Sequence, residues 1–173
     1  LFETDYTSTN YPTTDLNHWL YGSKFSSIVL GDNVTKIGDY AFKDCSSLKS
    51  ITIPNSVASI GIFTFNNCSS LTSIIIPDSV TEIGEQAFLS CSSLTSVTIP
   101  NSITSIGIYT FKRCSSLTSV TIPDSITSIG DYAFACCSSL KAFYGKFASA
   151  DNRCLIIDGV LNSFAPAGLT EYV

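Results

Sequence analysis

Apolar and polar residues alternate along short stretches of this chain, and these stretches recur at a regular interval. In the stretch 94–99, Leu94, Val97 and Ile99 are apolar, and Ser and Thr occupy the positions between them. This alternation predicts a short β-strand with one buried face. Pro100 is expected to end the strand, because proline has no N–H to donate to a neighbouring strand.

The complete pattern repeats every 23 residues and reads I-P-[ND]-S-[VI]-x-x-I-G-x-x-[AT]-F-x-x-C-S-S-L-x-S-[IV]-x. A fixed period of this length is typical of a solenoid, in which each unit adds one coil and only stacking on neighbours closes the core. The repeated positions form columns of glycine, phenylalanine and cysteine: Gly38, Gly61, Gly84, Gly107 and Gly130; Phe42, Phe65, Phe88, Phe111 and Phe134; Cys45, Cys68, Cys91, Cys114 and Cys137.

Two features predict the conformation of the path between strands. The column glycine, as at Gly84, is expected to have a positive φ, where a side chain would clash. Ala87, Cys91 and Leu94 follow at i, i+4 and i+7, which is helical spacing and predicts one short helical or 3₁₀ turn. Each coil is therefore expected to contain a strand, a tight corner, a return path and a helical turn.

The chain divides into three parts by this criterion. Residues 1–24 depart from the repeat, and we expect an N-terminal cap whose Trp19 and Tyr21 cover the first coil. Residues 25–145 contain five to six repeats. Residues 146–173 are irregular and end in a stretch that resembles the start of a further coil.

A hairpin is predicted within the irregular part. The stretches Cys154–Ile157 and Val160–Phe164 are rich in strand-forming residues, and Asp158-Gly159 lies between them. An Asp-Gly pair between two such stretches is a strong signal for a two-residue hairpin turn.

The repeat unit carries a family resemblance. Its strand half fits the leucine-rich repeat consensus L-x-x-L-x-L-x-x-N/C. In detail, C-S-S-L-T-S-V-T-I-P-x-S-[VI]-T-x-I-G-x-x-A-F resembles the BspA-like leucine-rich repeats, the Treponema pallidum type, from about Phe25 to Tyr144. With the periodicity, this implies a right-handed α/β solenoid with one parallel β-sheet of about six strands and short helical or 3₁₀ turns opposite. The resemblance further implies a cell-surface or secreted protein that mediates adhesion or binds host matrix proteins.

Composition narrows the classes of partner. Hydrophobic residues make up 45% of the chain, charged residues only 13%, and the net charge is −5 without any cluster of Lys and Arg. Such a charge distribution argues against nucleic acid as a partner. The chain also lacks an apolar run of about 20 residues, so this segment is not expected to cross a membrane.

The cysteines have several possible roles. Zinc binding is disfavoured, because the column lacks closely spaced cysteine pairs and the chain has one histidine. Stacked cysteines about 5 Å apart rarely reach the dihedral angle of a disulfide, so the column is expected to hold buried free thiols. Cys136 is outside the column and is expected to be exposed, while a disulfide involving Cys136 or Cys154 remains an open alternative.

Catalysis and cofactor binding are not expected. The aspartate and asparagine residues after each proline could offer oxygen atoms to Ca²⁺, but a turn already accounts for these residue types. His18 is the only histidine that could act as a general base, and no G-x-S-x-G sequence occurs. A carbohydrate-active domain would need clustered aromatic and acidic residues in a groove, which the sequence does not indicate. We therefore predict no enzyme activity, metal or cofactor.

The outward face of the sheet is the candidate binding surface. Its small hydroxyl side chains are interrupted by Ile75 and Tyr144, and large side chains usually dominate binding energy. An equally weighted alternative is that these small residues only keep the sheet regular. The candidate ligand-binding residues are Ser50, Thr52, Ser73, Ile75, Ser96, Thr98, Ser119, Thr121 and Tyr144.

A second row follows the glycine column and could be an aromatic stripe for a ligand. We favour packing between coils on the outer side of the solenoid. Two functions remain: a module that binds a protein or glycan, and an inert spacer or stalk within a longer surface protein. The row consists of Tyr40, Phe63, Gln86, Tyr109 and Tyr132.

Overall fold

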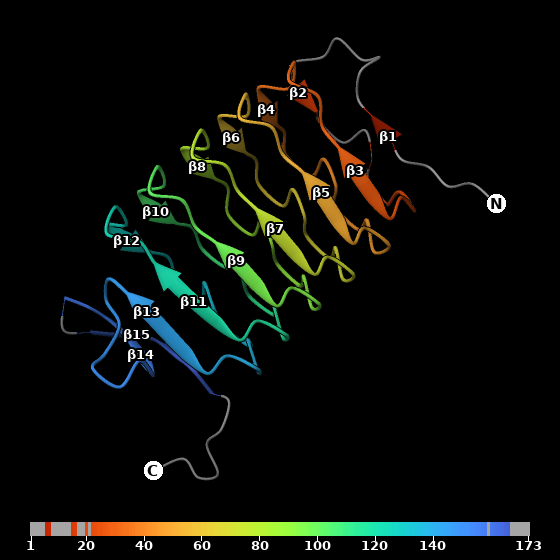
Figure 1. Cartoon of the computed structure of the whole chain (residues 1–173). Coiled ribbons are helices and arrows are strands. Elements are labelled where there is room, and N and C mark those ends of the chain that lie inside the picture. Colours follow the sequence, from red (N-terminus) through yellow and green to blue (C-terminus); the bar gives the residue numbers. More distant parts are fainter. Residues whose placement is uncertain (1–5, 8–14, 17–19, 21, 159, 167–173) are drawn as a thin grey trace.

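The protein is an elongated parallel β-solenoid in a computed structural model that describes residues 6–7, 15–16, 20, 22–158 and 160–166 (Figure 1). One long sheet, here called the main sheet, runs along one side. Its strands are β1 (Tyr6–Thr7), β3 (Ser27–Val29), β5 (Ser50–Thr52), β7 (Ser73–Ile75), β9 (Ser96–Thr98), β11 (Ser119–Ile122) and β13 (Ala142–Gly145).

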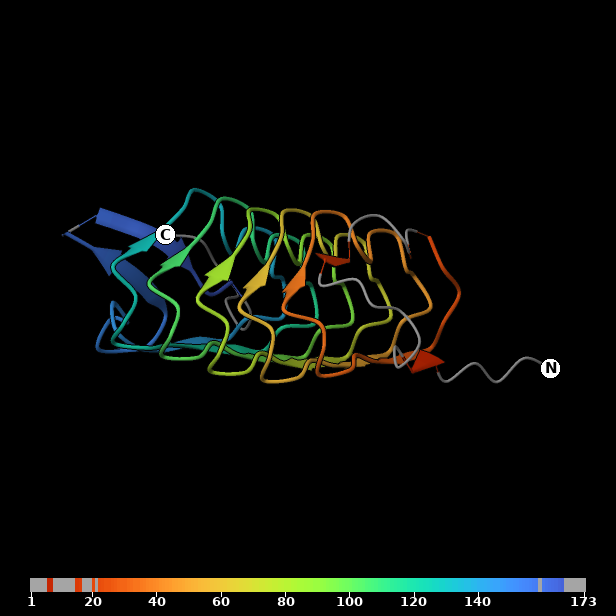
Figure 2. The same ribbon diagram turned by 90° about the horizontal axis from the view of Figure 1, so that it is seen from above.

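A second column of two-residue strands lies on another side of the coils. These are β2 (Asp15–Leu16), β4 (Lys36–Ile37), β6 (Ser59–Ile60), β8 (Glu82–Ile83), β10 (Ser105–Ile106) and β12 (Ser128–Ile129). Figure 2 shows the coils as a row of similar loops, with the main sheet along one edge and a hairpin at the C-terminal end. The hairpin is antiparallel and comprises β14 (Cys154–Ile157) and β15 (Val160–Phe164), as the sequence predicts.

The register of the main sheet follows from the 23-residue period. From β3 onward, each described partner pair between coils is 23 residues apart, for example Ser27 with Ser50 and Ser73 with Ser96, whereas β1 pairs with β3 at a separation of 22. Between β5 and β7, the N–H of Thr72 donates to the oxygen of Lys49, and this hydrogen bond continues the ladder of the main sheet. Because the register is in phase, every column of the sequence becomes a line of stacked, equivalent side chains.

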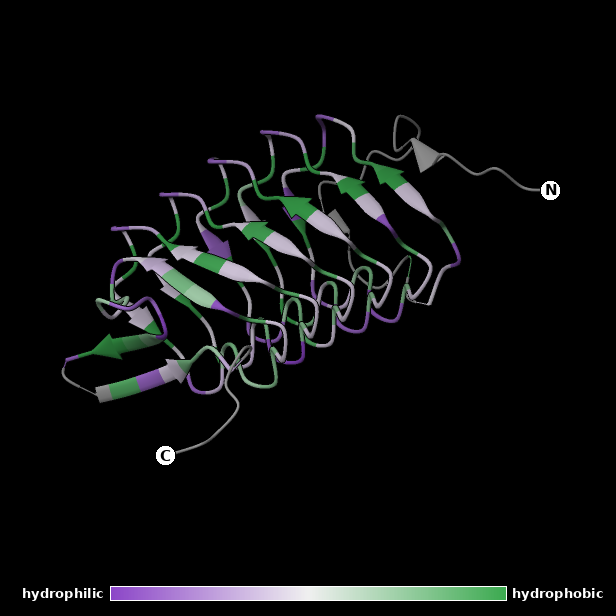
Figure 3. Ribbon diagram, turned by 60° about the horizontal axis from the view of Figure 1, so that its bottom comes forward, coloured by the Kyte–Doolittle hydropathy of each residue, from purple (hydrophilic) through white to green (hydrophobic). Residues whose placement is uncertain are grey.

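The core is built from these stacked columns. Inward residues of the strands are buried, and the phenylalanine column forms a continuous stack in which ring centroids are 5.3–5.5 Å apart and the planes within 11° of parallel. Phe143 ends this stack edge-on, with its centroid 5.4 Å from that of Phe134. Figure 3 shows the resulting alternation of hydrophobic and hydrophilic residues along the main strands.

The predicted helical turn is wrong, because the described residues contain no helix. The segments that run back from the second column, which we call return legs, are residues 38–45, 61–68, 84–91, 107–114 and 130–137. Each is a series of i→i+3 turns, and two of its residues have positive φ, as at Gln86 (58°) and Ser90 (63°). A positive φ at the third residue belongs to a type II turn and interrupts a helix. The i, i+4, i+7 spacing therefore arose from successive turns.

The predicted reason for the glycine column, a positive φ, is also wrong. Gly84 does not have a positive φ; the left-handed residue is two positions later, at Gln86. A Cβ on Gly84 would lie 2.5 Å from the carbonyl carbon of Gly61 and 2.5 Å from the nitrogen of Ile62. Glycine is thus needed at Gly61, Gly84 and Gly130 because the backbones of neighbouring coils approach closely there, whereas Gly107 has more room.

The N-terminal part continues the coil pattern in its described residues. β1 pairs in parallel with β3, and β2 pairs in parallel with β4, so each of these two strands extends its column by one position. His18, Trp19 and Tyr21, on which the prediction of a cap depends, lie outside the described residues, as does the stretch 169–173.

Candidate binding surface

Alternation along the main strands sends one set of side chains into the core and the other outward. All nine candidate ligand-binding residues are exposed on the outward face, in two parallel rows. Adjacent positions in a row are one coil apart, which is about 4.8 Å in a β-sheet. The first row contains Ser50, Ser73, Ser96 and Ser119, and the second contains Thr52, Ile75, Thr98, Thr121 and Tyr144.

The hydroxyl groups of this surface are not used by the fold. Within the described residues, the side chains of its serines and threonines form no hydrogen bond. The neighbouring threonine column behaves differently: the Thr95 hydroxyl donates to the oxygen of Thr72 at 3.1 Å, and the Thr118 hydroxyl to the oxygen of Thr95 at 3.3 Å. The two outward rows therefore present donors and acceptors that remain available to a partner.

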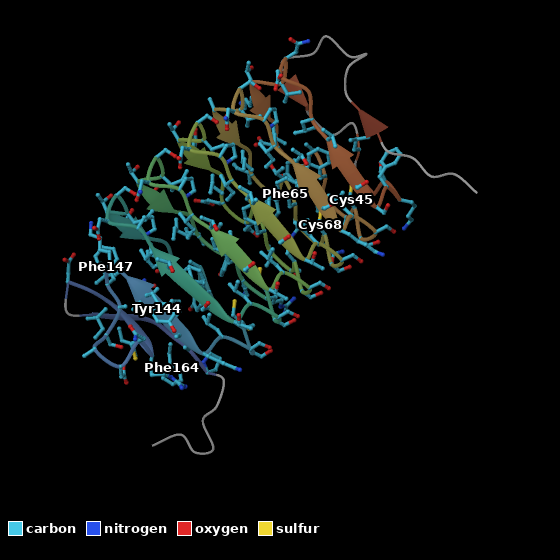
Figure 4. The ribbon with its side chains drawn as sticks, in the orientation of Figure 1. Cys45, Phe65, Cys68, Tyr144, Phe147 and Phe164 are labelled. Carbon is cyan, nitrogen blue, oxygen red and sulfur yellow. The ribbon has the colours of Figure 1, made fainter. Side chains whose placement is uncertain are left out.

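Two large side chains break the regularity of these rows. Ile75 is 78% exposed, and Tyr144 is 46% exposed on β13 near the C-terminal end of the main sheet (Figure 4). Val29 of β3 is 45% exposed in the same row. None of the outward residues is charged at neutral pH, so the surface can offer hydrogen bonds and apolar contact without long-range electrostatic attraction.

The aromatic row on the return legs packs between coils, as the sequence predicts. Tyr40 stacks on Phe63 with centroids 5.2 Å apart, and Tyr109 stacks on Tyr132 at 5.5 Å. Gln86 interrupts the row between these pairs. The Nζ of Lys112 lies 4.3 Å from the Tyr109 ring centroid, which is within the range of a cation–π contact.

The cysteine column is buried, as predicted, and each thiol also has a hydrogen-bond partner that the sequence did not reveal. The Sγ of Cys91 donates to the oxygen of Phe65 at 3.1 Å, and the other column thiols make the equivalent contact with the coil before. Burial raises the pKa of these thiols, to about 12 for Cys137. They are therefore protonated and unreactive in the folded protein, whereas Cys136 is exposed and Cys154 half-buried.

The remaining candidate chemistry keeps the positions expected from the sequence. The aspartate and asparagine column is exposed at the corners, as at Asp78 and Asn101. Among the described residues, no three His, Cys, Asp or Glu side chains form a group that could hold a metal ion. No helix in the described part of the chain has the length and apolar character to cross a membrane.

The sequence did not distinguish threonines whose hydroxyls form hydrogen bonds between coils from threonines whose hydroxyls form none among the described residues. Thr95 and Thr98 are both exposed β-branched residues of one repeat, but only Thr95 lies where its hydroxyl reaches the oxygen one coil earlier. The constancy of threonine at 72, 95 and 118 was the available signal. Sequence reasoning also missed a cleft of about 710 Å³ beside the hairpin.

Comparison with known proteins gives a consistent result. The sequence profile described as "BspA type Leucine rich repeat region" matches six copies over residues 17–141. Among solved structures, the chain is similar to a T. pallidum leucine-rich repeat protein, with 35% identity and a TM-score of 0.67, covering 69% of this chain and 58% of that one. No curated protein matches the chain.

Two further solved structures are surface or antigen proteins. A leucine-rich cell surface protein of Faecalibacterium prausnitzii is 32% identical, with a TM-score of 0.56, covering 79% of this chain and 42% of that one. The pneumococcal vaccine antigen PcpA is 28% identical, with a TM-score of 0.62, covering 79% and 34%. This chain thus spans less than two thirds of each of these relatives.

Proposed function

The chain belongs to the family of BspA-type leucine-rich repeat proteins, and from this premise we propose that it is a non-enzymatic interaction module of a cell-surface or secreted protein. The main sheet's outward face binds a protein or glycan partner. A leucine-rich cell surface protein and a vaccine antigen among its structural relatives support an extracellular location.

One observation carries the proposal: the outward face combines hydroxyl groups that the fold does not use with two large exposed side chains. A partner on this face would bury Ile75, which is 78% exposed. Full burial of such a side chain contributes about 1.5–3 kcal/mol. The surrounding hydroxyls, for example those of Thr98 and Thr121, would add hydrogen bonds that orient the partner and disfavour molecules that cannot form them.

The proposal is tested by a double variant, Ile75→Ser with Tyr144→Ser, against the wild type on a glycan array and a panel of extracellular matrix proteins. We expect binding to fall at least tenfold for any ligand that the wild type recognises. Ile62→Ser is the matched control, because Ile62 is 40% exposed but belongs to a return leg. Unchanged affinity of the double variant would exclude the sheet face.

A spacer within a longer surface protein is the second candidate function. It is favoured by the uninterrupted phenylalanine stack and the in-register ladder, which suit a rod whose coils contact only their neighbours. If the wild type binds nothing on either the array or the panel, the spacer is the better assignment.

A further inference from the structure

The return legs are joined by a ladder of backbone hydrogen bonds that stops at the last regular coil. At each of four junctions, three N–H groups on alternate residues donate to three carbonyl oxygens of the next coil, at 2.7–3.1 Å. At the last junction the donors are Tyr109, Phe111 and Arg113. The equivalent N–H groups of residues 132, 134 and 136 have no acceptor within the described residues.

The chain leaves the repeat path at the end of β13, before a further second-column strand and a further return leg could form. Gly145 has a φ of 80°, and a Cβ there would lie 2.2 Å from the oxygen of Ile122. After it, the chain forms the hairpin β14–β15 in place of another return leg, as Figure 1 shows. One contact ties the hairpin to the second column of strands: the Nδ2 of Asn162 donates to the oxygen of Ile129 at 3.4 Å.

A cleft of about 710 Å³ remains between the return leg 130–137 and the hairpin. Its apolar walls come from both sides: Tyr132 is 62% exposed on the return leg, and Leu161 is 61% exposed on β15. Phe164 of β15 also lines it, at the hairpin end of the molecule in Figure 4. Asp131 adds a negative charge.

We propose that this cleft is a docking groove for an extended peptide segment of another protein. Alternate backbone carbonyls of the segment accept hydrogen bonds from the N–H groups of Tyr132, Phe134 and Cys136, which is the mode of strand addition at an open edge. The four internal junctions specify the occupant, because each contains a backbone segment in that position. The occupant therefore runs parallel to the return leg and presents carbonyls on alternate residues.

The side chains of the occupant follow from the same internal template. Tyr132 stacks on Tyr109 on one side of its ring, so an aromatic residue of the peptide stacks on the free side. In the internal template a basic residue follows the aromatic one by three positions, and the Nζ of Lys112 lies 4.3 Å from the Tyr109 ring centroid. A basic residue at the equivalent position of the peptide would contact the peptide's own aromatic ring in the same way, and Asp131 supplies an opposite charge in the groove. The groove thus selects an extended segment with an aromatic residue followed by a basic one. This inference does not depend on the sheet face.

The probe is a synthetic peptide with the sequence of residues 106–114 and Ser in place of Cys114, which contains these features. Cys136 lines the groove and is exposed, so its alkylation by iodoacetamide, followed by mass spectrometry, reports occupancy. We expect the peptide to slow alkylation of Cys136 at least tenfold and saturably, and to protect the amides of residues 132, 134 and 136 from hydrogen exchange. Cys154 does not line the groove and is the internal control.

Two variants and one peptide complete the test. Leu161→Lys, on an exposed wall position, removes apolar surface and opposes the basic residues of the peptide, so it should weaken protection at least tenfold, whereas Ile75→Ser on the main sheet should leave it unchanged. A scrambled peptide should give no protection. The proposal is overturned if the peptide fails to protect Cys136, or if the scrambled peptide protects it equally. It is also overturned if Cys136 is protected without peptide, because the chain itself or a second copy would then fill the groove.

Discussion

The close approach of coils at the glycine column gives a sharp stability prediction. A Cβ on Gly84 would be 2.5 Å from two backbone atoms of the preceding coil, and ordinary contact begins near 3.4 Å. The coils must therefore separate locally by roughly 0.9 Å. That movement stretches the hydrogen bond from the Gly84 N–H to the oxygen of Ile60, now 2.8 Å, beyond its useful range.

The expected cost of Gly84→Ala combines two effects. Loss of the hydrogen bond costs about 1 kcal/mol, and overpacking typically costs about 1–3 kcal/mol. Replacing glycine by alanine also restricts the unfolded chain, which offsets about 0.4–1 kcal/mol of this because φ is not positive at Gly84. We expect the free energy of unfolding to fall by about 2–3 kcal/mol, measured by urea denaturation with circular dichroism.

Gly107→Ala is the matched control in the same column. A Cβ on Gly107 would first meet Glu85, at 3.3 Å from its Cα and Cγ, so a shift of a few tenths of an ångström accommodates it. We expect a change within about 0.5 kcal/mol there. If both variants lose the same stability, or Gly84→Ala loses none, the steric explanation is refuted. Equal loss is what a positive φ throughout the column would have produced.

Three further predictions concern other columns. Burial raises the pKa of the column thiols above the unfolded value of 9.0, so above this pH the folded chain retains protons that the unfolded chain releases. The contribution of these thiols to the free energy of unfolding should be constant below about pH 9 and fall above it, by up to about 1.4 kcal/mol per pH unit per thiol. Above about pH 9, the midpoint of urea denaturation should fall less steeply with pH for Cys91→Ala than for the wild type. Midpoints that do not change with pH would contradict this explanation. Arg113 is exposed and has a φ of 62°, a conformation that glycine adopts more easily than alanine. Arg113→Gly should therefore be more stable than Arg113→Ala by about 0.5–1 kcal/mol. Thermal melts that rank the two variants in the reverse order would contradict this explanation. The Ser79 hydroxyl donates to the oxygen of Val57 at 2.7 Å, whereas the buried Ser125 hydroxyl has no partner among the described residues. Ser79→Ala should therefore lower the free energy of unfolding by about 1 kcal/mol and Ser125→Ala should hardly change it. Equal losses in urea denaturation would show that the hydrogen bond of Ser79 is not the cause.

The strands and core columns could be predicted from the sequence because burial alone determines them. Alternation over residues 96–99, in which Val97 and Ile99 are apolar, recurs at a fixed period and indicates a strand with one face in a common core. The exposure of Ile75 and Tyr144 follows from the same alternation and is confirmed. What binds this face does not follow, because no property of a flat, uncharged row identifies one ligand.

The return legs could not be predicted because their conformation depends on the neighbouring coil. Ala87, Cys91 and Leu94 have helical spacing, yet Gln86 and Ser90 adopt a positive φ that costs each residue about 1 kcal/mol in isolation. The alternate N–H groups gain acceptors one coil away in exchange: those of Gln86 and Ser90 donate to the oxygens of Ile108 and Lys112. Local propensity is overridden by a ladder that exists only after stacking, and no single repeat contains that information.

The same dependence on neighbours explains where specific recognition can arise in a regular solenoid. Inside the stack, the backbones of the return legs and the rings of the phenylalanine column are already matched to their equivalents one coil away, so an interior repeat offers a partner mainly its outward side chains. At an interruption the matching fails. Ile75 replaces a hydroxyl on the main sheet and adds apolar surface, while the departure of the chain at Gly145 leaves three aligned N–H groups on the last return leg without an acceptor among the described residues. Adding regular repeats would lengthen the sheet without creating a new type of site, whereas a single substitution or inserted hairpin creates one. Specificity in such a protein should therefore change by interrupting the repeat, and variants at interruptions should alter binding far more than variants at regular positions such as Thr98.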